Sequence, residues 1–302
     1  MAFVTPEPTA AAAPGPSARF GAVIGQLFRR PLALVGLIVI AAIVLAAVFA
    51  PFIAPFDPAD QMFDGLTLEG APLPPGGKFL LGTDLLGRDL FSRLLYGART
   101  SLIVGVVANG VAVVIGAAVG ITAGFFGGIV GSVLMRFTDL MTAFPALLLA
   151  IVLAALFHPS LWIVALVIAL VNWVQLARVL YTETRALAQR EFVEAEWSIG
   201  LGRFRILLRH IFPHLLSTIL VYGTLGIATT VLLEATLSFL GVGVQPPTPS
   251  WGNIINENQT YFTSAPWLVF VPGVAIILLA LGFNLVGDAL RDILDPTQKG
   301  RY

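Results

Sequence analysis

The chain has 302 residues, of which 57% are hydrophobic and 11% are charged, and its mean hydropathy is +0.91. A soluble domain carries about 25% charged residues, so the composition excludes a soluble globular enzyme and indicates a polytopic membrane protein. The net charge of zero argues against a nucleic-acid binder, and the lack of cysteine excludes disulfides and Cys-ligated metals.

Six apolar stretches are long enough to cross a bilayer, which takes about 20 helical residues. Residues 1–31, rich in Ala and Pro, predict a largely disordered cytoplasmic tail. The stretch that follows exceeds the apolar region of a signal peptide and should remain as an anchor. We therefore expect an all-α integral membrane fold with six transmembrane helices, at residues 32–54, 101–125, 134–157, 161–180, 215–240 and 267–286.

The segment between the first two spans is amphipathic near its end. Over residues 84–99, leucines are interleaved with Asp84, Arg88, Asp89 and Arg93. This pattern predicts a short helix that lies on the outer membrane surface.

Glycines recur at every fourth position of the second span, at Gly116, Gly120 and Gly124. Small residues at this spacing form a face on which two helices can approach closely. We expect this face to pack within the subunit; packing against a partner subunit is the alternative.

The distribution of Lys and Arg predicts the orientation, because cytoplasmic segments are enriched in these residues. With both termini inside, thirteen basic residues lie on or next to the cytoplasmic side and four lie outside. We therefore predict an N-in, C-in topology, in which residues 181–213 are cytoplasmic and residues 55–100 and 241–266 face outward.

Few ionisable residues lie within the spans, where such groups are costly and often functional. Glu234 in the fifth span either bonds a neighbouring helix or takes part in a proton relay, and we favour the structural role. Arg136 and Asp139 are three residues apart and are expected to pair on one helix face. The three histidines, which form no metal-binding set, are expected at the membrane interfaces: His158, His210 and His214.

The chain carries no sequence signature of nucleotide hydrolysis. A phosphate-binding P-loop ends in Gly-Lys followed by Ser or Thr, whereas Lys78 is followed by Phe79 and Lys299 is preceded by Gln298. Active transport by this protein would need a separate ATPase or a proton relay around Glu234.

The cytoplasmic segment 181–213 has apolar residues at near-helical spacing with charged residues between them. Gly200, Leu201 and Gly202 predict a bend between two short helices. Such a helix either lies on the bilayer surface or docks into a groove on another protein. Pro213 is expected in the first turn of the fifth span, where a missing N–H costs little.

The outer segment 241–266 contains three prolines that precede Trp251. The prolines predict a stiff segment with little regular structure. Gln245 and Trp251 are our candidates for an outer gate or a docking surface.

Four segments together carry a family resemblance. The first three are GTDLLGRDLFSR at 82–93, Glu194-Ala195-Glu196 followed by Gly200 and Pro213, and SFLGVGVQPPTPSWG at 238–252. The fourth is FNLVGDALRDILDP at 283–296. In this order they resemble the C-type permease subunit of dipeptide and oligopeptide ABC importers, in which the second segment is the EAA loop. Glu196 in place of Ala and Phe212 in place of Leu are mild departures from that loop.

The resemblance implies that the EAA loop forms a coupling helix against an ATP-binding-cassette ATPase. It also implies a homologous second permease subunit, two ATPase subunits that bind ATP and Mg²⁺, an extracytoplasmic solute-binding protein, and a bacterial or archaeal inner membrane. This chain itself would bind no cofactor or metal and carry no catalytic residue. The coupling residues would be Glu194, Ala195, Glu196, Gly200, Leu201, Gly202, Arg203, Phe204 and Pro213.

The function implied is half of the translocation pathway for peptides or a related small solute. The alternative is a self-sufficient proton-coupled carrier that uses Glu234. In the permease reading the chain divides into the tail 1–31, the anchor 32–54, the outer segment 55–100, the core 101–288 with its loop 181–213, and the cytoplasmic tail 289–302.

Overall fold

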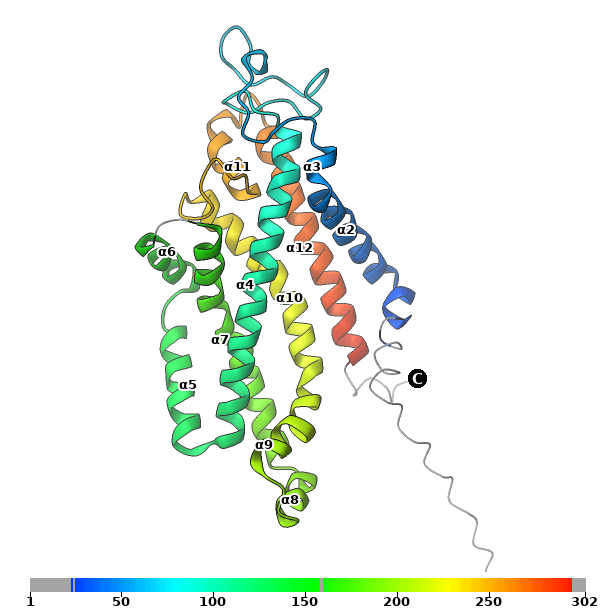
Figure 1. The fold of residues 1–302 in the computed structure, drawn as a ribbon, viewed down its shortest axis with the longest axis vertical. Coiled ribbons are helices and arrows are strands. Elements are labelled where there is room, and N and C mark those ends of the chain that lie inside the picture. The colour runs from blue at the N-terminus through cyan, green and yellow to red at the C-terminus, as the bar shows by residue number, and fades with distance from the viewer. Residues whose placement is uncertain (1–22, 24, 158–159, 295–302) are drawn as a thin grey trace, which may run out of the picture.

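A computed structural model of the chain describes residues 23, 25–157 and 160–294 and consists mainly of helices (Figure 1). The tail predicted at 1–31 falls largely outside the described residues, as do His158 and residues 295–302. The helices, in chain order, are α2 (Pro31–Val48), α3 (Ala50–Ile53), η1 (Phe63–Gly65), α4 (Leu90–Phe126), α5 (Gly128–Thr142), α6 (Ala146–Leu156), α7 (Leu161–Ala188), α8 (Glu191–Ser198), α9 (Arg203–Ile206), η2 (Leu207–Ile211), α10 (Phe212–Phe239), α11 (Trp251–Asn258), η3 (Gln259–Tyr261) and α12 (Trp267–Leu294).

The long helices form an elongated bundle with two different ends (Figure 1). α8 and α9 lie at one end, which we call the α8 end. α11 and the loops between α3 and α4 lie at the opposite end, which we call the α11 end.

Within the described residues, five helices are long and apolar enough to cross a membrane: α2, α4, α7, the continuous run Arg203–Phe239, and α12. α5 and α6 make a sixth crossing only if they are taken together, and they meet at 89°. The span predicted over 134–157 is therefore not one continuous helix but two helices that meet at a break. Pro145 lies at the N-cap of α6, and its ring disfavours the helical conformation at Phe144, which accounts for the break.

α4 begins eleven residues before the predicted start of the second span. The separate surface helix predicted over 84–99 is wrong, because this segment is a loop up to Asp89 and then the first turns of α4. Asp89 caps the helix by accepting a 2.7 Å hydrogen bond from the Ser92 N–H. With 37 residues, α4 is ~55 Å long against a hydrocarbon core of about 30 Å, so one of its ends projects beyond the membrane.

The glycine face of α4 packs against α7, and these two helices form the most extensive helix pair. A Cβ added at Gly116 would lie 2.7 Å from the Trp173 carbonyl oxygen, and one added at Gly120 would collide with the backbone of Ala177. The prediction that this face packs within the subunit is confirmed, since only glycine permits so close an approach.

The helix of the fourth span is longer than the span predicted over 161–180, because α7 continues to Ala188. The second short helix predicted after Gly200 exists as α9, but it is continuous with α10 through the π-helical turn η2. Pro213 lies in the first turn of α10, as predicted. The N–H of Phe212 bonds the Leu207 carbonyl, five residues back, so the wider turn precedes the proline that lacks an N–H.

The outer segment 241–266 is more regular than predicted, because it contains α11 and η3. The Ser250 side chain accepts from the Asn253 N–H at 3.3 Å, and the Asn253 side chain accepts from the Ser250 N–H at 2.9 Å. This capping box starts the helix. The three prolines precede the cap and so leave α11 uninterrupted.

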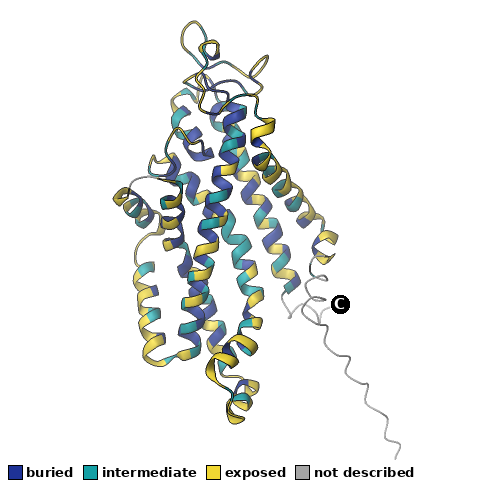
Figure 2. Cartoon of the chain, viewed as in Figure 1, coloured by how far each residue is buried: buried dark blue, intermediate teal, exposed yellow. Residues whose placement is uncertain are grey.

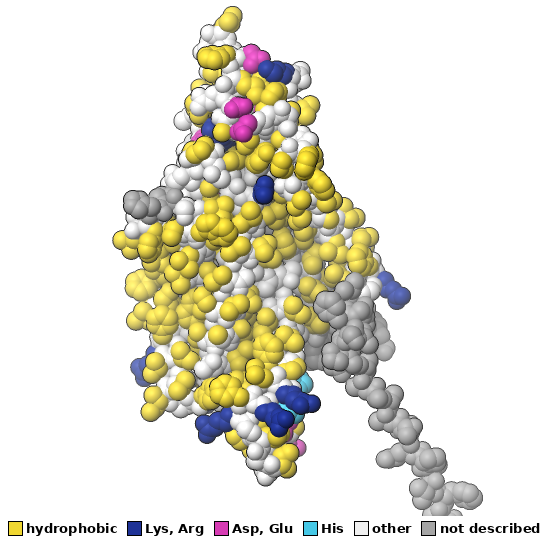
Figure 3. Space-filling model, viewed as in Figure 1, with side chains coloured by type: hydrophobic (Ala, Val, Ile, Leu, Met, Phe, Trp, Pro, Cys, Tyr) yellow, Lys and Arg dark blue, Asp and Glu magenta, His cyan; other side chains and the backbone are white. Residues whose placement is uncertain are grey.

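The surface of the bundle is apolar along most of its length (Figure 3). Exposed residues are frequent on the outer helices α2 and α5 (Figure 2). Large hydrophobic side chains are exposed on the outer helices, including Ile38 of α2 at 59%, Ile129 of α5 at 83% and Ile277 of α12 at 63%. Exposed apolar area on this scale requires a lipid or protein partner. Charged side chains gather instead toward the two ends (Figure 3), as a membrane-spanning bundle requires.

Candidate functional sites

α8 ends in a motif that requires glycine. Gly200 has φ +80°. Its N–H donates to the Trp197 carbonyl at 3.0 Å, and the Leu201 N–H donates to the Glu196 carbonyl at 3.1 Å. This pair of bonds is a Schellman motif, whose left-handed residue is usually glycine because it has no Cβ. The bend predicted at Gly200 is confirmed.

One buried side chain anchors α8 to the bundle. Val193 is fully buried and packs in a cluster with Leu180 of α7, Ile206 and Ile211. The other face of the segment is open and apolar, with exposures of 37% at Phe192, 42% at Trp197, 76% at Ile199 and 70% at Phe204.

Contacts to two long helices fix the position of α8. The Glu196 carboxylate contacts Nδ1 of His210 in the turn before α10. Phe125 of α4 stacks on Trp197 with ring centroids 6.4 Å apart, and the Arg203 guanidinium lies 5.9 Å from the Trp197 ring centre. These contacts link α8 to α4 and to the turn that precedes α10.

The residues predicted to form the coupling surface lie together at the α8 end. Glu196 and Leu201 are half-buried and link the segment to the bundle. The remaining residues of the set are exposed: Glu194, Ala195, Gly200, Gly202, Arg203, Phe204 and Pro213.

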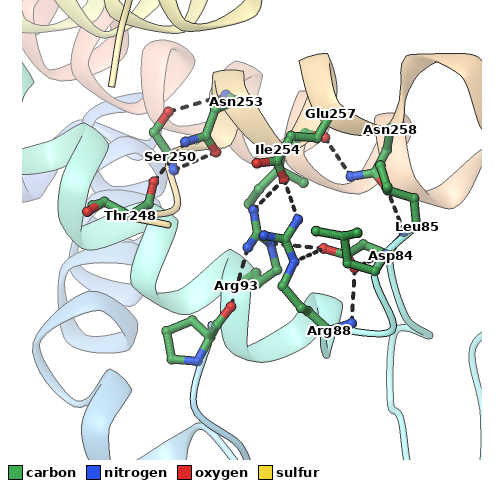
Figure 4. Close-up of polar contacts among 12 residues, drawn as sticks. Asp84, Leu85, Arg88, Arg93, Thr248, Ser250, Asn253, Ile254, Glu257 and Asn258 are labelled. Carbon is green, nitrogen blue, oxygen red and sulfur yellow. Dashed lines mark hydrogen bonds and ion pairs between the residues drawn. The ribbon is translucent and has the colours of Figure 1, made fainter. Parts of the chain in front are cut away.

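A buried cluster of four charges lies at the α11 end (Figure 4). Arg88 bonds Asp84 and Glu257, each at 2.6 Å. Arg93 also contacts both carboxylates, Asp84 at 3.3 Å and Glu257 at 2.7 Å. The two arginines and Asp84 are at most 4% exposed. Two positive and two negative charges compensate one another, which is the condition for burying them.

Neighbouring amides complete this cluster (Figure 4). The side-chain oxygen of Asn258 accepts from the Leu85 N–H at 3.2 Å, and the Asp84 carboxylate accepts from the Leu86 N–H at 2.9 Å. Arg93 also donates to the Pro58 carbonyl at 3.3 Å. The cluster thereby ties the loop before α4 to α11, and the first motif of the family resemblance supplies three of its four charges.

The sequence pattern does not predict this cluster. The charges interleaved with leucines over 84–99 predict a helix on the membrane surface, whereas Asp84 and Arg93 are 0% exposed. Glu257, the acid that pairs with both arginines, lies in a segment that was predicted to be irregular. No local pattern signals a partner so distant in sequence.

The two candidates for an outer gate differ in their surroundings. Trp251 is 1% exposed, packs beside Gly97 of α4, and donates from Nε1 to the Leu94 carbonyl at 3.0 Å. Its side chain is therefore unavailable as a docking contact and holds α11 against α4 instead. Gln245 is half-buried, and its amide donates to the Gly241 carbonyl at 2.9 Å.

Glu234 is fully buried between α4 and α10. It accepts hydrogen bonds from Ser101 of α4 at 2.9 Å and from Ser238 of α10 at 2.8 Å. The Ser238 hydroxyl also accepts from the Val244 N–H at 3.1 Å. Both carboxylate oxygens are thus engaged in bonds that hold α4, α10 and the following loop together.

The predicted pair of Arg136 and Asp139 is not present. Asp139 pairs instead with Arg178 of α7 at 2.7 Å, and Arg178 also donates to Thr142 at 2.8 Å. The pair therefore joins two helices rather than two turns of one. Within the described ranges, no group of three or more His, Asp or Glu residues is placed to hold a metal ion.

Two protein families match the chain. Residues 116–300 match the binding-protein-dependent transport system inner membrane component, and residues 20–75 match the N-terminal TM domain of oligopeptide transport permease C.

Curated relatives match over almost the whole chain. A dipeptide transport system permease protein from Alkalihalophilus pseudofirmus is 39% identical over 98% of this chain and 97% of its own. A dipeptide transport system permease protein from Escherichia coli is 44% identical over 88% of this chain and 89% of its own. A glutathione transport system permease protein from Escherichia coli is 41% identical over 90% of this chain and 88% of its own.

Proposed function

The chain belongs to the family of binding-protein-dependent transport system inner membrane components, and we propose that it forms half of the translocation pathway of an ATP-driven peptide importer. It is a multi-pass protein of the inner membrane. The relatives are named for dipeptides and glutathione, which share the peptide bond. A small peptide is therefore the proposed solute.

The single observation that carries this proposal is the geometry of α8. One side is anchored by Val193, while Phe192, Ile199 and the neighbouring Phe204 expose apolar surface. Acidic side chains, Glu191 and Glu194, occupy its first turn, where the helix dipole favours them. A short helix with this mixed face suits a groove on another protein. We propose that an ATPase subunit provides this groove.

The proposed assembly contains a second, homologous permease, two ATPase subunits that bind ATP and Mg²⁺, and an extracytoplasmic binding protein. The orientation predicted from Lys and Arg supports it, because it puts α8 in the cytoplasm. The same orientation puts the loops of the α11 end outside, where a binding protein would deliver the solute. Contacts of α8 with α4 and α10 would pass ATPase movement to the path.

The competing function is a proton-coupled carrier that uses Glu234. The hydrogen bonds from Ser101 and Ser238 favour a structural role for this carboxylate. A relay would also need further ionisable groups along the path, and Ser101 and Ser238 are neutral.

The proposal is tested by recovering the ATPase with the tagged chain in mild detergent. Wild type is compared with the variant Ile199→Asp with Phe204→Asp, in which two exposed apolar side chains at the α8 end become acidic. Leu68→Asp, at an exposed apolar side chain of the other end, is the control. We expect an ABC ATPase with wild type and control and a loss of it with the double variant. Equal recovery from all three would overturn the proposed role of α8.

A further inference from the structure

Three hollows in the described part of the chain meet at Gln175 of α7. The first, about 450 Å³, lies between α7 and the break that separates α5 from α6. The second, about 190 Å³, lies between α4, α7 and α10, and the third, about 520 Å³, between α7, α10 and α12. Because Gln175 lines all three, we treat them as one hollowed surface and call it the Gln175 groove.

The groove lies along the middle of α7. Gln175 lies fourteen residues after Leu161 and thirteen before Ala188, the two ends of α7, and inside the span predicted over 161–180. Its side chain and that of Thr229 on α10 are exposed, and Asn172 is half-buried. Polar side chains within a span face a bundle interior or water rather than lipid. The groove is thus no lipid-facing surface.

The opposite side of α7 has the character of a lipid-facing surface. Leu166 precedes Gln175 by nine residues, which at 3.6 residues per turn places the two about 180° apart on the helix. Leu166 is 47% exposed and its neighbour Trp162 is 65% exposed. One side of α7 therefore exposes polar side chains, and the opposite side exposes apolar ones.

Around Gln175 the polar lining of the groove carries no charge. It consists of Asn109, Asn172, Gln175, Tyr222 and Thr229. Toward the α8 end, Arg178, Glu183 and Arg291 line the groove. Arg178 pairs with Asp139 at 2.7 Å, and Glu183 accepts from Thr218 at 3.1 Å. With Asp139 included, these charges sum to zero.

We propose that the Gln175 groove is the wall that this subunit contributes to the translocation path, and that Gln175 determines specificity by bonding the peptide units of the passing solute. This assignment rests on the proposed function. An amide side chain both donates and accepts hydrogen bonds, as a peptide unit does. A neutral lining also imposes little selection on the charge of the solute's side chains.

The lack of cysteine in the chain makes the wall directly testable. The importer is assembled in nanodiscs with its partner subunits and treated with a charged, membrane-impermeant thiol reagent. Labelling of this chain is then measured by mass spectrometry. The variants are Gln175→Cys and Thr229→Cys, with Leu166→Cys as the lipid-facing control. We expect the two groove thiols to react and the control to stay unlabelled. A transported dipeptide should slow the reaction at position 175.

Failure of this inference is distinguishable from failure of the proposed function. If the complex assembles and hydrolyses ATP in response to the dipeptide-loaded binding protein, but both groove thiols stay unreactive with and without ATP, the wall assignment is overturned. If no ATPase joins the wild-type chain, the proposed function itself fails.

A pair of charge variants tests the role in specificity. Gln175→Glu should favour uptake of dipeptides with a basic side chain over acidic ones, and Gln175→Lys should reverse that preference. One charge pair in water at 4 Å is worth about 1 kcal/mol, so each uptake should change by about fivefold in opposite directions, and the ratio of the two should shift by about thirtyfold. An equal change for both peptides in both variants would show that Gln175 does not select the solute.

Discussion

Arg88 and Arg93 depend on Asp84 and Glu257 for compensation of their buried charge. The four side chains come from two segments that are far apart in the chain. Removing one acid would leave two arginines with a single carboxylate in the protein interior. Residues at this end therefore act mainly by fixing the outer loops onto α11.

The first prediction concerns this cluster. Glu257→Leu should lower the free energy of unfolding by about 3–5 kcal/mol, the usual cost of an uncompensated buried charge. Thermal unfolding of the detergent-solubilised chain measures the loss. Adding Arg93→Met should recover part of it. Asp64→Asn is the control, because Asp64 is exposed and its pKa is lowered mainly by a hydrogen bond from Lys78. Similar losses for Glu257→Leu and the control would contradict the account.

Two variants of Glu234 distinguish a structural role of this carboxylate from a role in a proton relay. Glu234→Gln keeps the size of the side chain and one oxygen that can accept from Ser101 or Ser238, so uptake should be largely retained. Glu234→Leu removes both bonds and leaves the two hydroxyls without this partner, so uptake and assembly should fall together. Measured uptake that is abolished by Glu234→Gln in a fully assembled complex would favour the relay.

Helix positions in this bundle depend on glycine at two kinds of site. At Gly120 the reason is the close approach of α4 to α7, and at Gly200 it is the left-handed backbone that ends α8. Each helix or turn offers a second glycine without that constraint. These pairs allow the packing and the backbone explanations to be tested separately.

In α4, Gly120→Ala should destabilise the subunit, because the new Cβ would overlap the backbone of Ala177. Gly110→Ala in the same helix meets no atom within 4 Å and should be neutral or stabilising by up to about 1 kcal/mol from helix propensity. The melting temperatures of the two variants give the comparison. A lower value for Gly110→Ala than for Gly120→Ala would be inconsistent with the packing described.

In the α8 segment, Gly200→Ala forces a side chain into φ +80°, at a cost of about 1–2 kcal/mol. Gly202 has φ −69° and open space around it, so Gly202→Ala strains no backbone and should reduce stimulation less than Gly200→Ala. Dipeptide-stimulated ATP hydrolysis by the assembled complex reports the difference. Stimulation that is unchanged in Gly200→Ala would mean that the geometry of α8 is not needed for coupling.

The sequence predicted the elements that depend on local composition. The apolar runs predicted α2, α7, α10 and α12, and the glycine pair predicted the bend after α8. Two misses had local signals, Pro145 for the break in the third span and the Ser250–Asn253 box for α11. The charge cluster had none, because the choice of Glu257 as the partner of Arg93 is made by the tertiary fold.

The whole molecule combines three regions with different surroundings. The α11 end holds loops by buried charge, and the middle exposes apolar side chains (Figure 3) together with the Gln175 groove. The α8 end presents a short amphipathic segment. Because the two ends differ, the proposed function requires that the chain has one fixed orientation in the membrane.

Single cysteines also test that orientation. With an impermeant thiol reagent, Leu68→Cys should be labelled in intact spheroplasts, because the basic residues place its loop outside. Ile199→Cys should be labelled only after the membrane is permeabilised. Labelling of both from the outside, or the reverse pattern, would contradict the N-in, C-in topology.

The central claim is tested most directly by solute uptake into proteoliposomes. The chain is reconstituted alone and with the second permease, the ATPases and the binding protein, and accumulation of a radiolabelled dipeptide is measured. The account predicts uptake only in the full complex, dependent on both ATP and the binding protein. Uptake by the chain alone, driven by a proton gradient, would contradict it.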